Sequence, residues 1–250
     1  CHLLKNPKLT TKTAPNMDKF YQDSFTTLYH GDCEEIIKHL PKVDLIVTSP
    51  PYNLNNTSGS AWSRLSNGYE SSLDNLDFDT YKVWHKKIIS LCWDRLADHG
   101  AIFWNHKPRA KGLELQLPLE LLPPEILLRQ ILIWDRGSGF QRTHMHFVPC
   151  QEWILLLAKP DFRLTNLTTF DIWRFPPTAD PNHPASFPID LPEMAIQSSN
   201  PSLILDPFCG SGTTLRAAKN AGIKAIGIEK SKKYCELTVN RMRQEVLWTA

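Results

Sequence analysis

The sequence predicts an α/β fold with a doubly wound, mostly parallel sheet at its core. Short apolar segments alternate along the chain with amphipathic ones, a pattern typical of strands joined by helices. Two apolar segments lead into distinctive loops, a proline-rich one over 49–52 and a glycine-rich one over 206–214. Because such sheets bind ligands at the carboxyl ends of their strands, we expect both loops at one functional edge.

Composition limits the classes of protein that fit. The 250 residues are 42% hydrophobic and 22% charged, enough for one full core. A formal charge of only +2 excludes a strongly basic, non-specific nucleic-acid coat, so a DNA-binding surface would have to be local. Six scattered cysteines without a close pair indicate neither a zinc site nor disulfides. Reduced thiols are the default for such cysteines, so we expect an intracellular protein. No apolar run reaches membrane-spanning length, so we expect no membrane partner.

The domain organisation is predicted to be simple. We expect a flexible N-terminal arm over 1–25, which lacks the apolar core of a signal peptide, and a single domain over 26–250. Because the chain begins with cysteine, we leave open an additional domain outside this segment. A homodimer is a separate open alternative.

The first half of the domain alternates strands and helices. We predict a strand over 26–29, a short helix over 34–40 and a strand over 44–48. A helix over 80–96, with Asp79 as its N-cap, precedes a strand over 101–104. The polar segment over 53–79 has little apolar periodicity. A segment of that length without evident structure is typical of functional or disordered loops.

The second half supplies the remaining strands. We predict strands over 129–134 and 152–158 with a polar loop between them. The chain then continues through a proline-rich stretch to a helix over 191–198, a strand over 203–206, a helix over 215–220 and a strand over 224–229. The total is about seven strands.

The proline-rich loop Ser49-Pro50-Pro51-Tyr52 has a rigid backbone. Its two prolines fix φ and remove two backbone donors, so the carbonyl groups point outward. A small hydroxyl, two preset carbonyls and an aromatic ring would suit a planar amine. Taken alone, the same residues are equally typical of an ordinary loop after a strand.

The glycine-rich loop follows a buried-strand pattern. Gly210 and Gly212 allow positive φ and a close approach of the backbone to a ligand at a helix start. The next strand ends in Glu229, about as far along the chain as the ribose-binding carboxylate of dinucleotide folds.

Together, Thr48-Ser-Pro-Pro-Tyr52 and Asp206-Pro-Phe-Cys-Gly-Ser-Gly-Thr-Thr214 resemble the S-adenosylmethionine-dependent DNA amino-methyltransferases, which methylate N4 of cytosine or N6 of adenine. The proline loop precedes the glycine loop, as in the circularly permuted β group of that family, and the resemblance extends over about 26–243. It implies a Rossmann-like sheet of about seven mostly parallel strands with one late antiparallel strand. It also implies DNA as substrate, S-adenosyl-L-methionine as methyl donor, S-adenosyl-L-homocysteine as product and no metal.

The resemblance assigns roles at the cofactor end. Glu229 would accept hydrogen bonds from two ribose hydroxyls, Asp206 would lie near the methionine amino group, and Asp32 with Cys33 would border the adenine. On local grounds Asp32 is equally typical of a turn, and Lys230 of a solvated surface. The other predicted cofactor residues lie in or beside the matching motifs: Thr48, His183, Pro184, Pro207, Phe208, Gly210, Ser211, Gly212, Thr213, Thr214 and Lys230.

At the catalytic end, the resemblance makes the Ser49 hydroxyl and the Pro50 carbonyl acceptors for the amine protons, which would aim the nitrogen lone pair at the methyl group. Pro51 would keep the loop rigid, and Tyr52 would stack on a base turned out of the duplex. Asn53 and Asn105 are candidates for the target-base pocket. A capping or purely structural role for Asn105 is at least as typical.

The target base is less strongly indicated. Within the family that the chain resembles, serine at position 49 and Phe187 are both more typical of the cytosine-N4 enzymes, with adenine N6 as the alternative. A binding protein without turnover is a third hypothesis, against which the two intact loops argue. DNA contacts are expected from the loops 53–79 and 136–150, although a solvated hairpin is an alternative for the second. The predicted DNA-contacting residues are Arg64, Lys107, Arg109, Arg136, Gln141 and Arg142.

Overall fold

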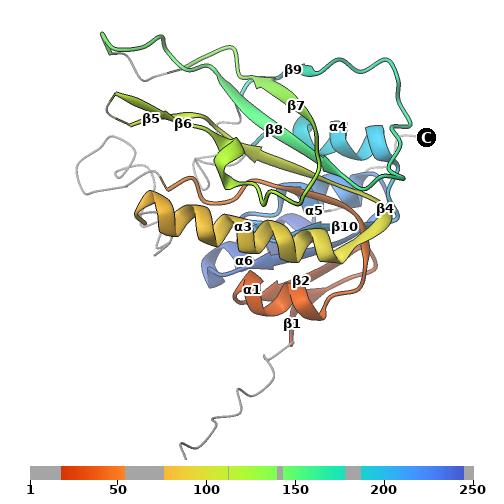
Figure 1. Ribbon diagram of the computed structural model, residues 1–250. Helices are drawn as coiled ribbons and strands as arrows, with labels where there is room; N and C mark the ends of the chain where they lie inside the picture. The colour runs from red at the N-terminus through yellow and green to blue at the C-terminus, as the bar shows by residue number, and fades with distance from the viewer. Residues whose placement is uncertain (1–17, 54–75, 112, 140–142, 178–186, 245–250) are drawn as a thin grey trace, which may run out of the picture.

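The computed structural model describes residues 18–53, 76–111, 113–139, 143–177 and 187–244. Within them, a nine-stranded mixed sheet runs through the molecule in the order β1-β2-β11-β10-β3-β4-β8-β7-β9 (Figure 1). A separate two-stranded ribbon, β5-β6, follows β4.

The strands and helices have the following bounds. The strands are β1 (Lys19–Gln22), β2 (Thr26–His30), β3 (Val43–Thr48), β4 (Leu96–His106), β5 (Arg109–Lys111), β6 (Glu114–Gln116), β7 (Leu128–Asp135), β8 (Gln151–Ala158), β9 (Ile172–Arg174), β10 (Leu203–Asp206) and β11 (Lys224–Glu229). The helices are α1 (Cys33–Ile36), α3 (Phe78–Arg95), α4 (Asp190–Ser199), α5 (Thr213–Asn220) and α6 (Lys232–Met242), with 3-10 turns η1 (Ile37–His39) and η2 (Pro118–Leu121).

The sheet confirms the predicted fold class. Strands β2, β11, β10, β3 and β4 are parallel neighbours, and β8 runs antiparallel between β4 and β7. These seven strands form the expected sheet, and two short edge strands, β1 and β9, extend it. The carboxyl ends of β3, β4, β10 and β11 therefore lie at one edge, where the amino end of β8 also lies.

Two apolar layers cover the faces of the sheet. Because side chains alternate along a strand, Leu45 and Val47 of β3 face one layer and Ile46 faces the other. The first layer contains residues of α4, α5 and α6, and the second contains residues of α1 and α3. Helices on both faces make the fold doubly wound, as predicted.

Three local predictions need correction. Strand β1 lies inside the predicted flexible arm and pairs with β2, so residues 19–22 belong to the sheet. Helix α3 begins at Phe78, and its N-cap is Asp77, whose side chain accepts a hydrogen bond from the Thr80 amide at 2.9 Å. The carboxylate of Asp79 instead pairs with Lys82 one turn further along. Helix α6 and the β5-β6 ribbon were not predicted.

Candidate functional site

The two loops singled out in the sequence meet at the same sheet edge. Strands β3 and β10 are hydrogen-bonded neighbours, so the residues that follow them lie side by side. The buried Thr48 hydroxyl donates to Asp206 Oδ1 at 2.7 Å. This bond links the end of β3, just before the proline loop, to the start of the glycine loop.

Asp206 is almost fully buried at the end of β10, with 1% of its surface exposed. Burial raises the pKa of its carboxyl from 3.8 to about 6, although hydrogen bonds from Thr214, Thr48 and the Phe208 amide partly offset the effect. The Phe208 amide donates to Oδ1 at 3.1 Å. A cationic partner would stabilise the ionised form of such a buried carboxylate, and an α-amino group is a cation of this kind.

The glycine loop lies between Asp206 and α5. Gly210 and Gly212 have φ of 51° and 83°, in the left-handed region that other residues rarely adopt. The Gly210 amide donates to Glu229 Oε2 at 2.9 Å, and the Ser231 amide donates to Oε1 at 2.7 Å. Each carboxylate oxygen of Glu229 therefore has one amide donor and retains lone-pair capacity for a diol.

The buried residues of this end fit a polar ligand. The Ser211 hydroxyl is buried and has no hydrogen-bond partner among the residues described. Burial raises the pKa of Glu229, while the Ser231 and Gly210 amides lower it. An orphaned donor and an acceptor-only carboxylate, joined by a glycine-rich backbone, are groups that suit the ribose and amino-acid parts of a nucleoside cofactor.

The remaining predicted cofactor residues are placed as follows. Asp32 caps α1 by accepting from the Glu34 amide at 3.0 Å, and Lys230 Nζ lies 3.1 Å from its other oxygen. This geometry matches the turn role that remained open for Asp32. Phe208 packs against Trp84 and Trp104. Cys33, Pro207, Thr213 and Thr214 are buried near this edge, whereas His183 and Pro184 lie outside the described residues.

The proline loop carries a dense hydrogen-bond cluster. Ser49 Oγ lies 2.7 Å from Tyr52 Oη, which donates to Glu152 Oε2 at 2.9 Å. Asn105 Nδ2 donates both to Tyr52 Oη at 2.6 Å and to Glu152 Oε2 at 2.9 Å. Asn105 thus lies beside the loop as predicted, and Glu152 is a residue that sequence reasoning missed. No local signal in the sequence marks it, because its place depends on the direction of β8.

Side chains from other elements also hold the loop backbone. Tyr81 of α3 donates to the Pro51 carbonyl at 2.6 Å, and Arg109 Nη1 donates to the Tyr52 carbonyl at 2.9 Å. Asn53 has φ of 53°, and both ends of its amide bond the backbone of Leu76 at 2.8 Å. Asn53 therefore ties residue 53 to residue 76, and its amide is engaged by that backbone.

Three of the predicted DNA-contacting cations converge on this cluster. Lys107 Nζ lies 5.7 Å from the centre of the Tyr52 ring, and Arg109 holds the loop carbonyl. Arg136 Nη1 lies 3.4 Å from Glu152 Oε1, and Nη2 donates to the Pro149 carbonyl at 2.9 Å. Arg64, Gln141 and Arg142 lie outside the described residues.

The Tyr52 ring has a buried aromatic neighbour, His106, with ring centres 4.7 Å apart. His106 is 3% exposed, and its Nε2 is 2.7 Å from the Tyr81 hydroxyl. Burial lowers the pKa of His106 to about 3, so its imidazole is neutral at physiological pH. This neutral ring gives Tyr52 a rigid support on one side.

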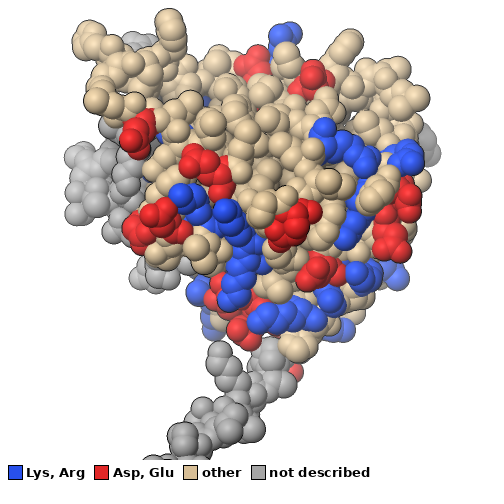
Figure 2. Space-filling model, viewed as in Figure 1, with Lys and Arg blue, Asp and Glu red and all other residues tan. Residues whose placement is uncertain are grey.

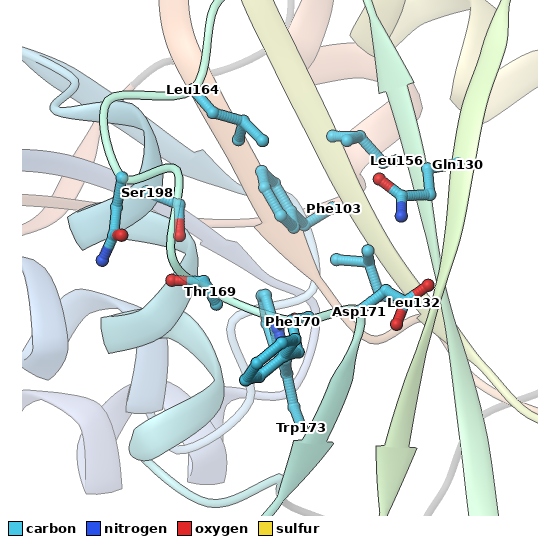
Figure 3. A pocket seen from close by; sticks show the side chains of 11 residues that line it. Phe103, Gln130, Leu132, Leu156, Leu164, Thr169, Phe170, Asp171, Trp173 and Ser198 are labelled. Atoms are coloured by element: carbon cyan, nitrogen blue, oxygen red, sulfur yellow. Dashed lines mark hydrogen bonds between the residues drawn. The ribbon is translucent and has the colours of Figure 1, made fainter.

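The surface and the interior add two observations. On the face shown in Figure 2, basic and acidic side chains are interspersed in the lower half, and the upper half carries few charges. A cavity of about 40 Å³ lies beside β7, β8 and β9, lined by residues that include Phe103, Leu132 and Trp173 (Figure 3). None of the predicted site residues lines that cavity.

Metal-ligand clusters and membrane-spanning helices are both absent from the described part of the chain. No group of three or more His, Cys, Asp or Glu side chains there could hold a metal ion. None of the helices in those ranges has the length and apolar character needed to cross a membrane.

Sequence comparison relates the chain to DNA methylases. The family model described as DNA methylase, for N6 and N4 methyltransferases, matches residues 43–240. The type II methyltransferase M.ScaI of Streptomyces caespitosus is 26% identical over 90% of this chain and 84% of its own length. The orphan methyltransferase M.BamHII of Bacillus amyloliquefaciens is 39% identical over 87% and 92% of the two chains. The DNA adenine methyltransferase YhdJ of Escherichia coli is 24% identical over 86% and 82%.

Solved structures show the same fold. The cytosine-N4-specific PvuII DNA methyltransferase superposes with a TM-score of 0.73 at 17% identity, over 92% of this chain and 90% of that one. A DNA modification methylase of Thermus thermophilus, solved with S-adenosyl-L-methionine, superposes with a TM-score of 0.63 at 23% identity, over 88% and 93%.

Proposed function

This chain belongs to the DNA methylase family of N6 and N4 amino-methyltransferases, and we propose that it transfers a methyl group from S-adenosyl-L-methionine to N4 of a cytosine turned out of DNA. The observation that carries the choice of base is the Ser49 hydroxyl, at the first position of the catalytic loop and within hydrogen-bond distance of Tyr52. The cytosine-N4 specificity in the name of the PvuII enzyme agrees with this choice.

The cofactor end would hold the methyl donor through groups already oriented in the fold. Glu229 would bind the ribose diol, Asp206 the amino group of the methionine part, and the Gly210 and Ser211 region its remaining polar atoms. When bound, S-adenosyl-L-methionine supplies a sulfonium methyl group that needs no further activation.

The catalytic end would prepare the nucleophile. The lone pair of an exocyclic amine is delocalised into the ring, so the amine becomes reactive when acceptors draw its protons out of the ring plane. The Ser49 hydroxyl and the Pro50 carbonyl would act as these acceptors, with Tyr52 stacked on the base. The base must leave the duplex first, because its amino group is otherwise paired and out of reach. The methylated amine is acidic enough to lose its proton to solvent.

Methylation of adenine N6 is the second candidate. It is favoured by the similarity to YhdJ, whose name specifies adenine, and by the shared chemistry of the two exocyclic amines. The Pro50 carbonyl would serve either base, and the serine at the first position of the loop is what favours cytosine.

Nucleoside analysis of treated DNA tests the proposal. DNA of mixed sequence is incubated with the protein and methyl-labelled S-adenosyl-L-methionine, digested to nucleosides and analysed by mass spectrometry, with Ser49→Ala as the matched control. We expect N4-methylcytosine with the wild type and much less with Ser49→Ala. N6-methyladenine would overturn the base assignment. No methylated base, with calorimetry showing that the cofactor binds, would favour a binding protein without turnover.

A further inference from the structure

Glu152 lies at the end of a hydrogen-bond chain whose direction is fixed by which groups can donate. Its side chain is 7% exposed, and Oε1 lies 3.4 Å from the Arg136 guanidinium. Oε2 accepts from Tyr52 Oη and Asn105 Nδ2, both at 2.9 Å. Burial and the nearby Glu152 charge raise the pKa of Tyr52, so the phenol keeps its proton. The one proton of that phenol is therefore committed to Glu152.

The orientation of the Tyr52 hydroxyl determines that of Ser49. With its proton directed at Glu152, the Tyr52 oxygen can only accept from its other two neighbours. Asn105 Nδ2 donates to it at 2.6 Å, and Ser49 Oγ lies at 2.7 Å. Ser49 must therefore donate its proton to Tyr52. A ligand that meets the Ser49 oxygen then finds lone pairs and no proton.

Glu152 also fixes the Asn105 amide. Only the nitrogen end of an amide can face a carboxylate, so Nδ2 points at Glu152 and Oδ1 points away from it. Asn105 is 1% exposed, and its Oδ1 has no hydrogen-bond partner among the described residues. A buried acceptor without a donor is costly, and a ligand N–H would satisfy it. Ser49 and Asn105 are thus two acceptors set by one carboxylate.

We propose that Glu152 is a specificity-determining positioning residue that makes Ser49 and Asn105 obligate acceptors, so that the pocket admits an exocyclic amine and rejects the corresponding carbonyl. An amine offers two N–H donors, whereas a ring oxygen at the same position would face lone pairs with no donor. This distinguishes cytosine from uracil or thymine, and adenine from hypoxanthine. The inference rests on the proposed function but applies to either target base.

Replacing Glu152 by glutamine would release this constraint. The glutamine amide can donate to Tyr52 Oη, which frees the phenol proton to point at Ser49. The Ser49 hydroxyl could then turn its own proton toward a carbonyl oxygen. Glu152→Gln should therefore discriminate less between an amine and a carbonyl at the target position, and it should methylate its target base more slowly. The cofactor end should be unchanged. Glu125→Gln makes the same change at an exposed position and serves as the matched control.

The test compares two duplexes that carry the sequence methylated by the wild type. One holds the natural target base, and the other holds its oxo analogue, uracil for cytosine or hypoxanthine for adenine. Because the oxo base has no amine to methylate, the quantity compared is the affinity for each duplex. We expect wild type and Glu125→Gln to bind the duplex with the amino base about 100-fold more tightly than the oxo duplex, and Glu152→Gln to bind it less than about tenfold more tightly. Cofactor affinity should stay within about threefold in all three proteins. Tyr52→Phe removes the hydroxyl through which Glu152 acts on Ser49 but leaves the Asn105 amide facing Glu152, so it should reduce the preference in part. The double variant should lose no more than Glu152→Gln alone.

Two results would overturn the inference. One is an active wild type whose preference for the amino base survives in both Glu152→Gln and Tyr52→Phe. The other is a Glu152→Gln protein that loses affinity equally for both duplexes and for the cofactor, which is the result that a merely structural role would give. An inactive wild type that methylates no DNA would instead remove the proposed function, and this inference with it.

Discussion

The two ends of the site are built in different ways. At the cofactor end, the donors that hold Asp206 and Glu229 include near neighbours in the chain, such as the amides of Phe208 and Ser231. At the target end, Tyr52 contacts the nearby Ser49 but is held mainly by Asn105 and Glu152, which lie 53 and 100 residues away in the chain. Local sequence therefore specifies much of one end, and sheet topology assembles the other. Damage at one end should leave the other end largely intact.

Tyr52→Ala should give the largest effect. It removes the stacking ring and the hydroxyl that joins Ser49, Asn105 and Glu152, so we expect kcat/KM on DNA to fall about 1000-fold. Steady-state methylation with labelled cofactor measures the loss. Tyr52→Phe retains the ring and separates stacking from hydrogen bonding, and it should lose less. A Tyr52→Ala protein within tenfold of wild type would show that the loop has another role.

Asp206→Asn should change stability in a pH-dependent way. Burial raises the carboxyl pKa from 3.8 to about 6, so ionisation disfavours the cofactor-free fold above pH 6 and costs nothing below pH 4. Asparagine removes that cost. We expect the variant to be more stable by up to about 3 kcal/mol at pH 7.5 and equally stable near pH 4, measured by urea unfolding. Cofactor affinity should fall at the same time.

Asp44→Asn is the control of opposite sign. Burial alone would raise the pKa of Asp44, but hydrogen bonds from Ser202 and Leu203 outweigh it and lower the pKa. Its ionised form therefore stabilises the fold at neutral pH, and that contribution is lost in acid. Asp44→Asn should destabilise the protein at pH 7.5. If both variants shifted stability in the same direction at pH 7.5, the assigned environments would be wrong.

Gly212→Ala should weaken the cofactor end through the backbone. Its φ is 83°, and an added Cβ would lie 2.8 Å from Thr238 Cγ2. We therefore expect the free energy of unfolding, measured by chemical denaturation, to fall by about 2–3 kcal/mol. Gly137 has φ of 65°, and a Cβ added there would meet nothing within 4 Å, so Gly137→Ala isolates the backbone strain at about 1 kcal/mol. Equal losses in both variants would show that the Thr238 contact is irrelevant.

Lys230→Ala should have the smallest effect. The ammonium group pairs with Asp32 at 3.1 Å, but the two side chains are 63% and 45% exposed. Exposed pairs contribute little because water and salt screen them. Titration calorimetry should find cofactor affinity within about threefold of wild type. A tenfold loss would make Lys230 a direct cofactor contact.

The sequence predicted the parts of the fold and site that local patterns specify. The central strands, the glycine turn and the proline loop follow from apolar runs and special backbone residues, and Asn105 follows from its place at the end of a strand. Strands β1 and β9, at four and three residues, are too short to show periodicity. Whether the site residues act as assigned stays a prediction.

Glu152 was missed for a topological reason. Functional residues were sought at the carboxyl ends of parallel strands, but β8 runs antiparallel, so its amino end reaches that edge. The pairing of Asn105 with Ile154 brings Glu152 beside the catalytic loop. No local pattern around residue 152 contains this information, because it depends on the direction of a strand that pairs about 50 residues away.

Calorimetric titration with S-adenosyl-L-methionine, performed on the wild type, Tyr52→Ala and Asp206→Ala, tests the separation of the two ends most directly. The wild type should bind, Tyr52→Ala should bind within about threefold of it, and Asp206→Ala should bind at least about tenfold more weakly, because a buried carboxylate that meets a cationic amino group is lost. Equal weakening of cofactor binding in both variants would contradict the account, and no binding by the wild type would remove its basis.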